Sequence, residues 1–148
     1  VCCLMLILAA AALPRFDVLA GVQADYEAAC LAADLRYMQE LSRQEAYRHE
    51  GLAVAKTSVA QLHLSVGIHG YQIMQDGVSS PLVAHTCKGD IRMGTGEMGR
   101  TGNVSFAADG DIIPAPCTIH IWSKKQHRVV IIDQAGRIRV ERRQMDEG

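Results

Sequence analysis

The chain lacks the sequence patterns that mark the common enzyme and metal-binding classes. It has no G-x-S-x-G, H-E-x-x-H or P-loop pattern, and its five cysteines include no C-x-x-C pair. The first three absences leave no motif for a serine hydrolase, a zinc metalloprotease or a phosphate-binding loop. The fourth argues against a zinc site. We therefore expect a protein that is not an enzyme and has no cofactor and no metal.

The sequence also has no cluster of histidines. The six histidines are scattered along the chain, at His49, His63, His69, His85, His120 and His127. His63 and His120 fall in expected strands, where surface or packing positions are the common outcome. A metal cluster assembled from these residues by the fold is the alternative. Asp76 and Asp109 each precede glycine, which is typical of turns rather than of cation sites.

The chain has little net charge of either sign. Its formal charge is -1, so no global field favours nucleic acid or an anionic membrane. Four arginines nevertheless gather near the C-terminus, at Arg137, Arg139, Arg142 and Arg143. A solvated edge strand is the expected explanation, and a small anion-binding patch is the alternative.

What the chain does have is an uncharged start. No charged residue occurs from Val1 to Leu13, and Pro14 follows. The run is too short to cross a bilayer and has the length of a secretory signal core. Because a helical pattern continues through Arg15 and Leu19, we expect a membrane helix whose first turns precede Val1. Its membrane-embedded stem spans residues 1–20 and includes Leu4, Leu6, Ile7, Leu8, Leu13 and Pro14.

The same helix is expected to continue, amphipathic, over residues 21–50. Its apolar residues fall into two stripes on well-separated faces, at about 100° per residue. The first stripe is Ala24, Ala28, Leu31, Leu35, Met38, Ser42 and Ala46. The second is Val22, Tyr26, Cys30, Ala33, Tyr37 and Leu41.

Two stripes require two partners. We expect the chain's own strands to cover the first stripe. The second is then the helix assembly face, made of Tyr26, Cys30, Ala33, Tyr37 and Leu41, and it packs on the helix of a neighbouring copy or relative. Burial of the whole helix inside one larger core is the alternative.

The remainder, residues 51–148, changes to a period of two and predicts a globular antiparallel β domain. The expected strands are Val59–Val66, Gly70–Gln75, Leu82–Thr86, Asp90–Met93, Asn103–Phe106, Cys117–Trp122, Arg128–Asp133 and Arg137–Val140. The first two form a hairpin and the last three a meander. Gly94, Gly96 and Gly99 form a G-x-G-x-x-G, but a strand rather than a helix follows it, so we interpret the segment as a loop.

Two cysteines fall in the strand region, at Cys87 and Cys117. If that region lies outside the cytoplasm, they are the candidate disulfide. Two buried free thiols are the alternative.

Several segments together resemble a known family. They are Ala12-Leu13-Pro14, Leu31–Tyr37, Val104–Gly110, and Val129–Val140 with its Gly-Arg-Ile-Arg close. The chain resembles a minor type IV pilin or type II secretion pseudopilin of the GspH/FimT type. The resemblance spans nearly the whole chain, although residues 56–102 match only in pattern.

This resemblance implies an α+β, type IV pilin-like fold with a long N-terminal helix on an antiparallel sheet. It also implies a single-pass protein of the bacterial inner membrane, with its globular domain outside the cytoplasm. Other pilins or pseudopilins and a prepilin peptidase, which cleaves a leader and methylates the new N-terminus, are the implied partners. Neither the cleavage motif nor the glutamate expected in the first mature turns is present in this sequence.

The function implied is assembly near the tip of a secretion pseudopilus or a pilus. In a DNA-uptake pilus, nucleic acid in contact with Arg137 and Arg139 would be a further partner. The rival function is a secreted binding protein that has a small β domain and a cleaved signal.

Overall fold

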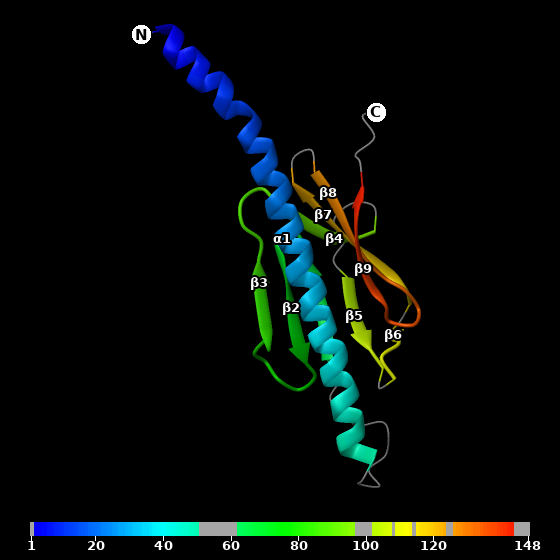
Figure 1. Ribbon diagram of the computed structural model, residues 1–148. Coiled ribbons are helices and arrows are strands. Elements are labelled where there is room, and N and C mark those ends of the chain that lie inside the picture. Colours follow the sequence, from blue (N-terminus) through cyan, green and yellow to red (C-terminus); the bar gives the residue numbers. More distant parts are fainter. Residues whose placement is uncertain are drawn as a thin grey trace.

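The computed structural model describes residues 2–50, 62–96, 102–107, 109–113, 115–123 and 126–143, and within the helix it describes the side chains of residues 19–44. Among these described residues, helix α1, Cys2–Glu50, is followed by nine strands. Its N-terminal half projects beyond the strands, and its C-terminal half lies across them (Figure 1). This confirms the α+β fold class, with one long helix on antiparallel strands.

Helix α1 has almost the predicted extent. It continues through Pro14 and ends at Glu50, directly before Gly51. The side chains of the expected membrane stem, from Leu4 to Pro14, lie outside those described. Within the described part of the chain, no helix combines the length and apolar character needed to span a membrane.

The strands form two antiparallel sheets rather than one. The first has the order β3-β2-β1-β5-β6, from Val83–Thr86, Gly70–Gln75, Leu62–Gly67, Gly102–Phe106 and Ile112–Ile113. The second has the order β4-β7-β8-β9, from Arg92–Thr95, Cys117–Ser123, Gln126–Ile132 and Ile138–Arg143. The predicted β1–β2 hairpin and the β7–β8–β9 meander are both present.

The chain changes sheet at the glycine-rich segment. Strand β4 pairs with β7 in the second sheet, whereas β5 pairs with β1 in the first. Gly94 and Gly96 are among the described residues, and Gly99 lies outside them. Since β5 begins at Gly102, no helix follows at the place that a dinucleotide-binding fingerprint requires.

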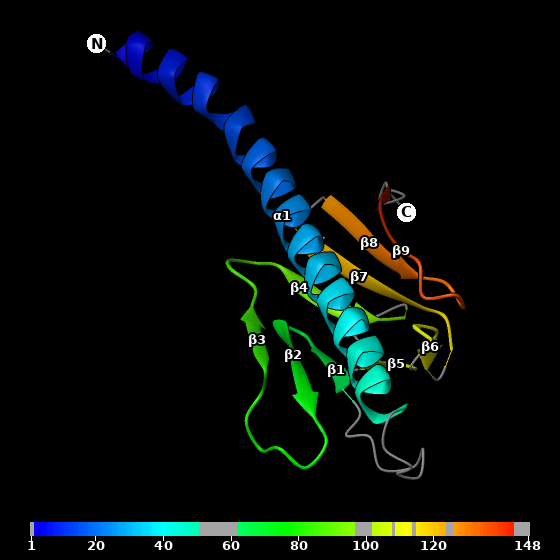
Figure 2. The ribbon, with the colours of Figure 1, turned by 60° about the horizontal axis from the view of Figure 1, so that its bottom comes forward.

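The core forms where the buried face of the helix packs against the buried faces of the strands. Every second residue of β1 is buried, namely Leu62, Leu64 and Val66, because alternate side chains of a strand point to one face. Helix α1 lies against β7, β8 and β9 and also touches β1 and β5, so it covers both sheets (Figure 2). The first helical stripe supplies five fully buried residues: Ala24, Ala28, Leu31, Leu35 and Met38.

Candidate assembly surface

Polar side chains beside the buried stripe fix the rotation of α1 about its axis. The Asp25 carboxylate accepts hydrogen bonds from Arg128 on β8 at 2.5 Å and from Arg142 on β9 at 3.0 Å. The Arg128 hydrogen bond is the main cause that lowers the pKa of Asp25, and burial opposes it. Because Arg128 is itself buried, Asp25 supplies the countercharge that a buried guanidinium needs.

A second set of contacts fixes the helix to the first sheet. Glu27 is buried, and its carboxylate lies 2.5 Å from the Nε2 atom of His85 on β3. The His85 ring stacks on Tyr71 of β2, with centroids 5.0 Å apart. The Tyr71 hydroxyl donates to Asp34 on the helix at 2.7 Å. Burial and the Asp34 carboxylate together raise the pKa of Tyr71, so it stays a donor.

A third contact lies near the C-terminal end of the helix. The Gln39 side-chain amide donates to the carbonyl oxygens of Gly110, at 2.8 Å, and Gly136, at 3.0 Å. Gly136 has φ +70°, and a Cβ atom there would lie 2.0 Å from the Gly110 oxygen. Glycine is therefore required where these two turns meet the helix.

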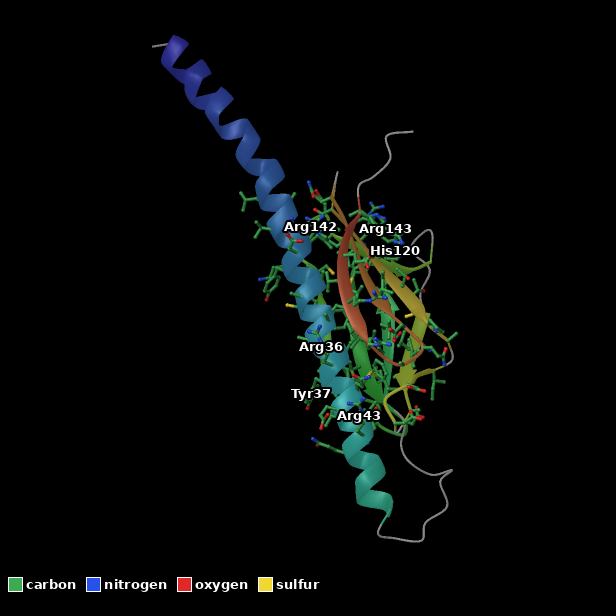
Figure 3. The ribbon with its side chains drawn as sticks, turned by 45° about the vertical axis from the view of Figure 1, so that its right-hand side comes forward. Arg36, Tyr37, Arg43, His120, Arg142 and Arg143 are labelled. Carbon is green, nitrogen blue, oxygen red and sulfur yellow. The ribbon has the colours of Figure 1, made fainter. Side chains whose placement is uncertain are left out.

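With its rotation fixed, α1 presents the second stripe to solvent. Val22, Tyr26 and Tyr37 of this stripe are 60%, 59% and 53% exposed, and Ala33 is exposed between them. Leu19, about one turn before the stripe at the end of the expected stem, is 62% exposed. At about 100° per residue these positions lie within one narrow face, opposite the buried stripe. Figure 3 shows Tyr37 on the side of the helix that points away from the strands. Large apolar side chains gathered in this way are typical of an interaction surface.

The margin of this face is less exposed than its centre. Cys30 and Leu41 are half-buried, and Leu41 packs against the core from its edge. The Cys30 side chain raises the pKa of Tyr26, one helical turn earlier. Of the residues expected on the assembly face, Tyr26, Ala33 and Tyr37 form the exposed centre.

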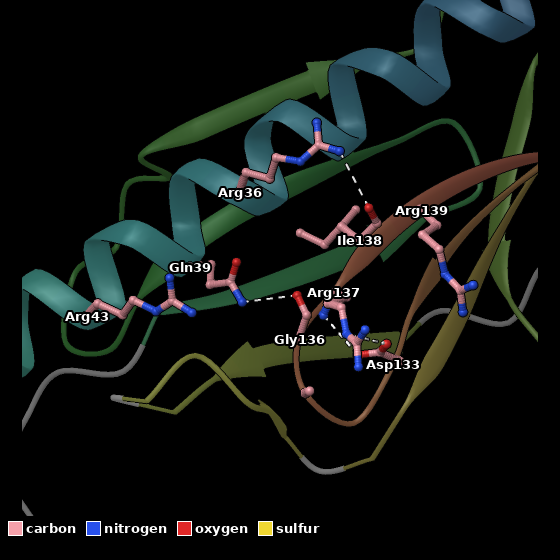
Figure 4. Close-up of a pocket in the computed structure, with 9 residues that line it drawn as sticks. Arg36, Gln39, Arg43, Asp133, Gly136, Arg137, Ile138 and Arg139 are labelled. Atoms are coloured by element: carbon pink, nitrogen blue, oxygen red, sulfur yellow. Dashed lines mark hydrogen bonds and ion pairs between the residues drawn. The ribbon is translucent and has the colours of Figure 1, made fainter.

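A basic groove of about 630 Å³ lies between the second half of α1 and the β8–β9 turn. Arg36 and Arg43 line it from the helix, and Arg137 and Arg139 line it from the turn and β9 (Figure 4). Asp133 is the acidic residue in the lining, and it pairs with Arg137 at 3.3 Å. Arg142, by contrast, lies at the other end of β9, on Asp25.

Neither a metal site nor a disulfide is found in the part of the chain that the structure describes. No group of three or more histidine, cysteine, aspartate or glutamate side chains could hold a metal ion. Cys87 and Cys117, the candidate disulfide, are free thiols. Cys87 follows β3 of the first sheet, whereas Cys117 begins β7 of the second. Burial raises the pKa of Cys87 to about 12 and that of Cys117 to about 11.

The residues that hold the helix in place were largely missed by the sequence analysis. Glu27 sits beside the apolar stripe, yet no local pattern links it to His85, 58 residues later. Arg128 looks like the first residue of an ordinary strand, and its partner Asp25 lies 103 residues away. A weak signal existed in Asp25 and Asp34, which lie between the two apolar stripes, where a helix meets the margins of its sheet.

Comparisons with known proteins give a likeness of fold. No protein-family model matches the chain, and no curated protein matches it. Among solved structures, the chain is similar to the minor pseudopilin EpsH from the Type 2 Secretion System of Vibrio cholerae, with a TM-score of 0.59 and 12% sequence identity. The match covers 81% of this chain and 97% of that one. The chain therefore has a pseudopilin-like fold.

Proposed function

We propose that the chain is a minor pilin or pseudopilin subunit of the GspH/FimT type. It assembles through the exposed face of α1 with related subunits into a type II secretion pseudopilus or a type IV pilus, near the filament tip. The single observation that carries the proposal is the row of exposed Leu19, Val22, Tyr26 and Tyr37 opposite a fully buried stripe. The likeness of fold to a minor pseudopilin supports the same role.

The physical basis is differential burial. The exposed stripe adds little to the stability of the single chain, because water still surrounds it. Packing against another helix would remove its apolar surface from water at about 25 cal/mol per Å². Arg36 and Glu40 border the stripe on the helix surface and would restrict which neighbours fit.

In this proposal the stem over residues 1–20 anchors the subunit in the bacterial inner membrane before assembly. The amphipathic part, residues 21–50, then packs in the filament, and the β domain over residues 51–148 lies outside the cytoplasm. A prepilin peptidase processes the precursor. The role is structural rather than enzymatic.

The test compares two double variants of equal charge in the native host. Val22→Glu with Tyr26→Glu alters the exposed stripe, whereas Gln72→Glu with Asn103→Glu alters the exposed outer face of the first sheet. We expect both proteins to fold and only the stripe variant to be missing from the isolated filament fraction. Incorporation of the stripe variant at the level of the control would contradict the proposal.

The basic groove favours a second candidate function, contact with nucleic acid. Arg36 and Arg43 line the groove together with Arg137 and Arg139, which the sequence analysis named as possible contacts of nucleic acid. Guanidinium groups are well suited to binding phosphate. Replacing Arg137 and Arg139 with alanine should then weaken retention of DNA and make it less dependent on salt. Unchanged retention would remove this candidate.

A further inference from the structure

We propose that the end of the β domain nearest the stem is a docking surface for the headgroups of anionic phospholipids. The inference rests on the proposed membrane stem and adds a second contact between subunit and bilayer. Three parts of the β domain form this end, namely the β3–β4 loop, the start of β8 and the end of β9.

These three parts gather around residues 21–25 of the helix. A Cβ atom on Gly21 would lie 3.7 Å from the Gln126 side chain at the start of β8. The Gln23 side chain donates to the Lys88 carbonyl in the β3–β4 loop at 3.1 Å. Arg142, at the end of β9, binds Asp25. The β domain therefore begins at the level of Gly21.

This level lies close to the bilayer if the stem is embedded. The stem ends at residue 20, directly before Gly21. Even where only its uncharged run to Leu13 lies in the hydrocarbon, the eight residues from Pro14 to Gly21 rise about 12 Å along a helix. The headgroup layer is about 5–7 Å thick on each side of the hydrocarbon. The remaining gap is shorter than the screening length of about 8 Å at physiological salt, and extended lysine and arginine side chains can bridge it.

Charge is distributed unequally between the two ends of the β domain. The end near the stem carries exposed Lys88, Arg92, Arg142 and Arg143 and buried Arg128, with Asp25, Asp90 and the buried Glu27 as acidic neighbours. Glu141 lies two residues before Arg143 on β9. The far end holds four aspartates and three arginines: Asp76, Asp109, Asp111, Asp133, Arg43, Arg137 and Arg139. Figure 3 shows Arg142 and Arg143 at the end from which the helix projects, and Arg43 toward the other end.

A cross-strand row adds an aromatic group to the basic end. Arg92 on β4 pairs directly with Trp122 on β7, and Arg143 on β9 pairs directly with His127 on β8, beside Trp122. Directly paired residues share one face of a sheet, so the half-buried Trp122 lies between two exposed arginines. Tryptophan flanked by basic side chains is typical of the bilayer–water interface.

The arrangement favours a lipid surface over a protein or nucleic acid partner. Its cationic side chains lie on both faces of the second sheet, Arg142 on the helix side and Arg92 and Arg143 on the other, at the end from which the helix projects, and they do not line a groove. A planar anionic surface crossed by that helix would meet the exposed ones, Lys88, Arg92, Arg142 and Arg143, at once, and the helix would hold the β domain against it.

The experiment measures flotation of the full chain with vesicles of phosphatidylcholine alone or of phosphatidylcholine mixed with phosphatidylglycerol. Arg92→Glu with Arg143→Glu reverses charge at the proposed surface, and Arg137→Glu with Arg139→Glu reverses the same charge at the far end. We expect the first variant to lose the preference for anionic vesicles, with binding at least about tenfold weaker, and the second to keep it. Since Trp122 is the single tryptophan, brominated phosphatidylglycerol should quench its fluorescence in the wild type.

Three outcomes would overturn the inference. Equal binding of the wild type to both vesicles would remove the anionic preference while leaving the proposed stem intact. An equal loss in both variants would assign the effect to overall charge. Failure of the wild type to bind either vesicle would contradict the membrane stem of the proposed function as well.

Discussion

The Glu27 carboxylate on α1 lies 2.5 Å from the His85 ring on β3, and 1% of the Glu27 side chain is exposed. A carboxylate removed from water is costly unless a partner compensates it. His85 provides that partner and stacks on Tyr71. The Tyr71 hydroxyl in turn donates a hydrogen bond to Asp34 on the helix. Two points on α1 are thus tied to neighbouring strands, and this holds the exposed stripe in one orientation.

Glu27→Ala should destabilise the chain by about 2–3 kcal/mol, at the low end for a broken buried pair because His85 is partly exposed. Urea unfolding followed by circular dichroism measures the change. The matched control is Glu40→Ala on the exposed side of the helix, expected within about 0.5 kcal/mol of the wild type. Equal unfolding midpoints for the two variants would contradict a structural role for Glu27.

Asp25 should make stability depend on pH in the acid range. The Arg128 hydrogen bond lowers the pKa of Asp25 in the folded chain below its ordinary value of 3.8. Its contribution is therefore fully present above the pKa of the unfolded chain and is lost as the pH falls through the lower, folded value. Since Asp25 is partly exposed and screened by solvent, we expect Asp25→Asn to cost about 1–2 kcal/mol at pH 7.

The measurement for Asp25 is the free energy of unfolding of wild type and Asp25→Asn from pH 7 down to pH 2. The difference between them should stay constant to about pH 5 and shrink below about pH 4. A difference in unfolding free energy that grows as the pH falls would mean that folding raises the pKa of Asp25, and it would contradict the Asp25–Arg128 interaction as its cause.

The buried Cys87 thiol and the half-buried Cys117 thiol should be unreactive in the folded chain. With pKa values raised to about 12 and about 11, Cys87 and Cys117 hold almost no thiolate at pH 8. In a variant with Cys2, Cys3 and Cys30 changed to serine, a thiol reagent should label the chain slowly until urea is added. Absence of labelling in urea without reductant would instead indicate a Cys87–Cys117 disulfide.

Neighbouring positions on opposite faces of α1 should respond differently. Leu35 is fully buried, so Leu35→Ala should cost about 2–5 kcal/mol. Tyr37 is 53% exposed, so Tyr37→Ala should change the stability of the single chain by less than about 1 kcal/mol. Thermal unfolding of the two purified variants makes the comparison. A similar loss for both would mean that Tyr37 already has a partner within the chain.

Most of the fold could be predicted from local periodicity in the sequence. The 3.6-residue spacing of Leu31, Leu35 and Met38 identified the buried face, and the alternation from Leu62 to Val66 identified a strand. Turn residues then positioned the β1–β2 hairpin and the final meander. These features depend on residues a few positions apart, which a single sequence displays directly.

Long-range pairing was not predictable in the same way. The division of the strands into two sheets, in which β4 joins β7 while β5 joins β1, depends on contacts that no local pattern encodes. The two-residue strand β6 is too short to show a period. The partners of Asp25 and Glu27 depend equally on the completed fold, because they come from strands more than 50 residues away.

The central claim is that the exposed face of α1 meets the helix of another subunit. The most direct measurement is photocrosslinking in the native host, with a benzophenone amino acid at Tyr26 or Tyr37 and, as control, at the exposed Gln72. We predict adducts from Tyr26 and Tyr37 whose second member, sequenced by mass spectrometry, has a pilin-type N-terminal helix and is joined through it. No adduct from either position, or the same adducts from Gln72, would contradict the account.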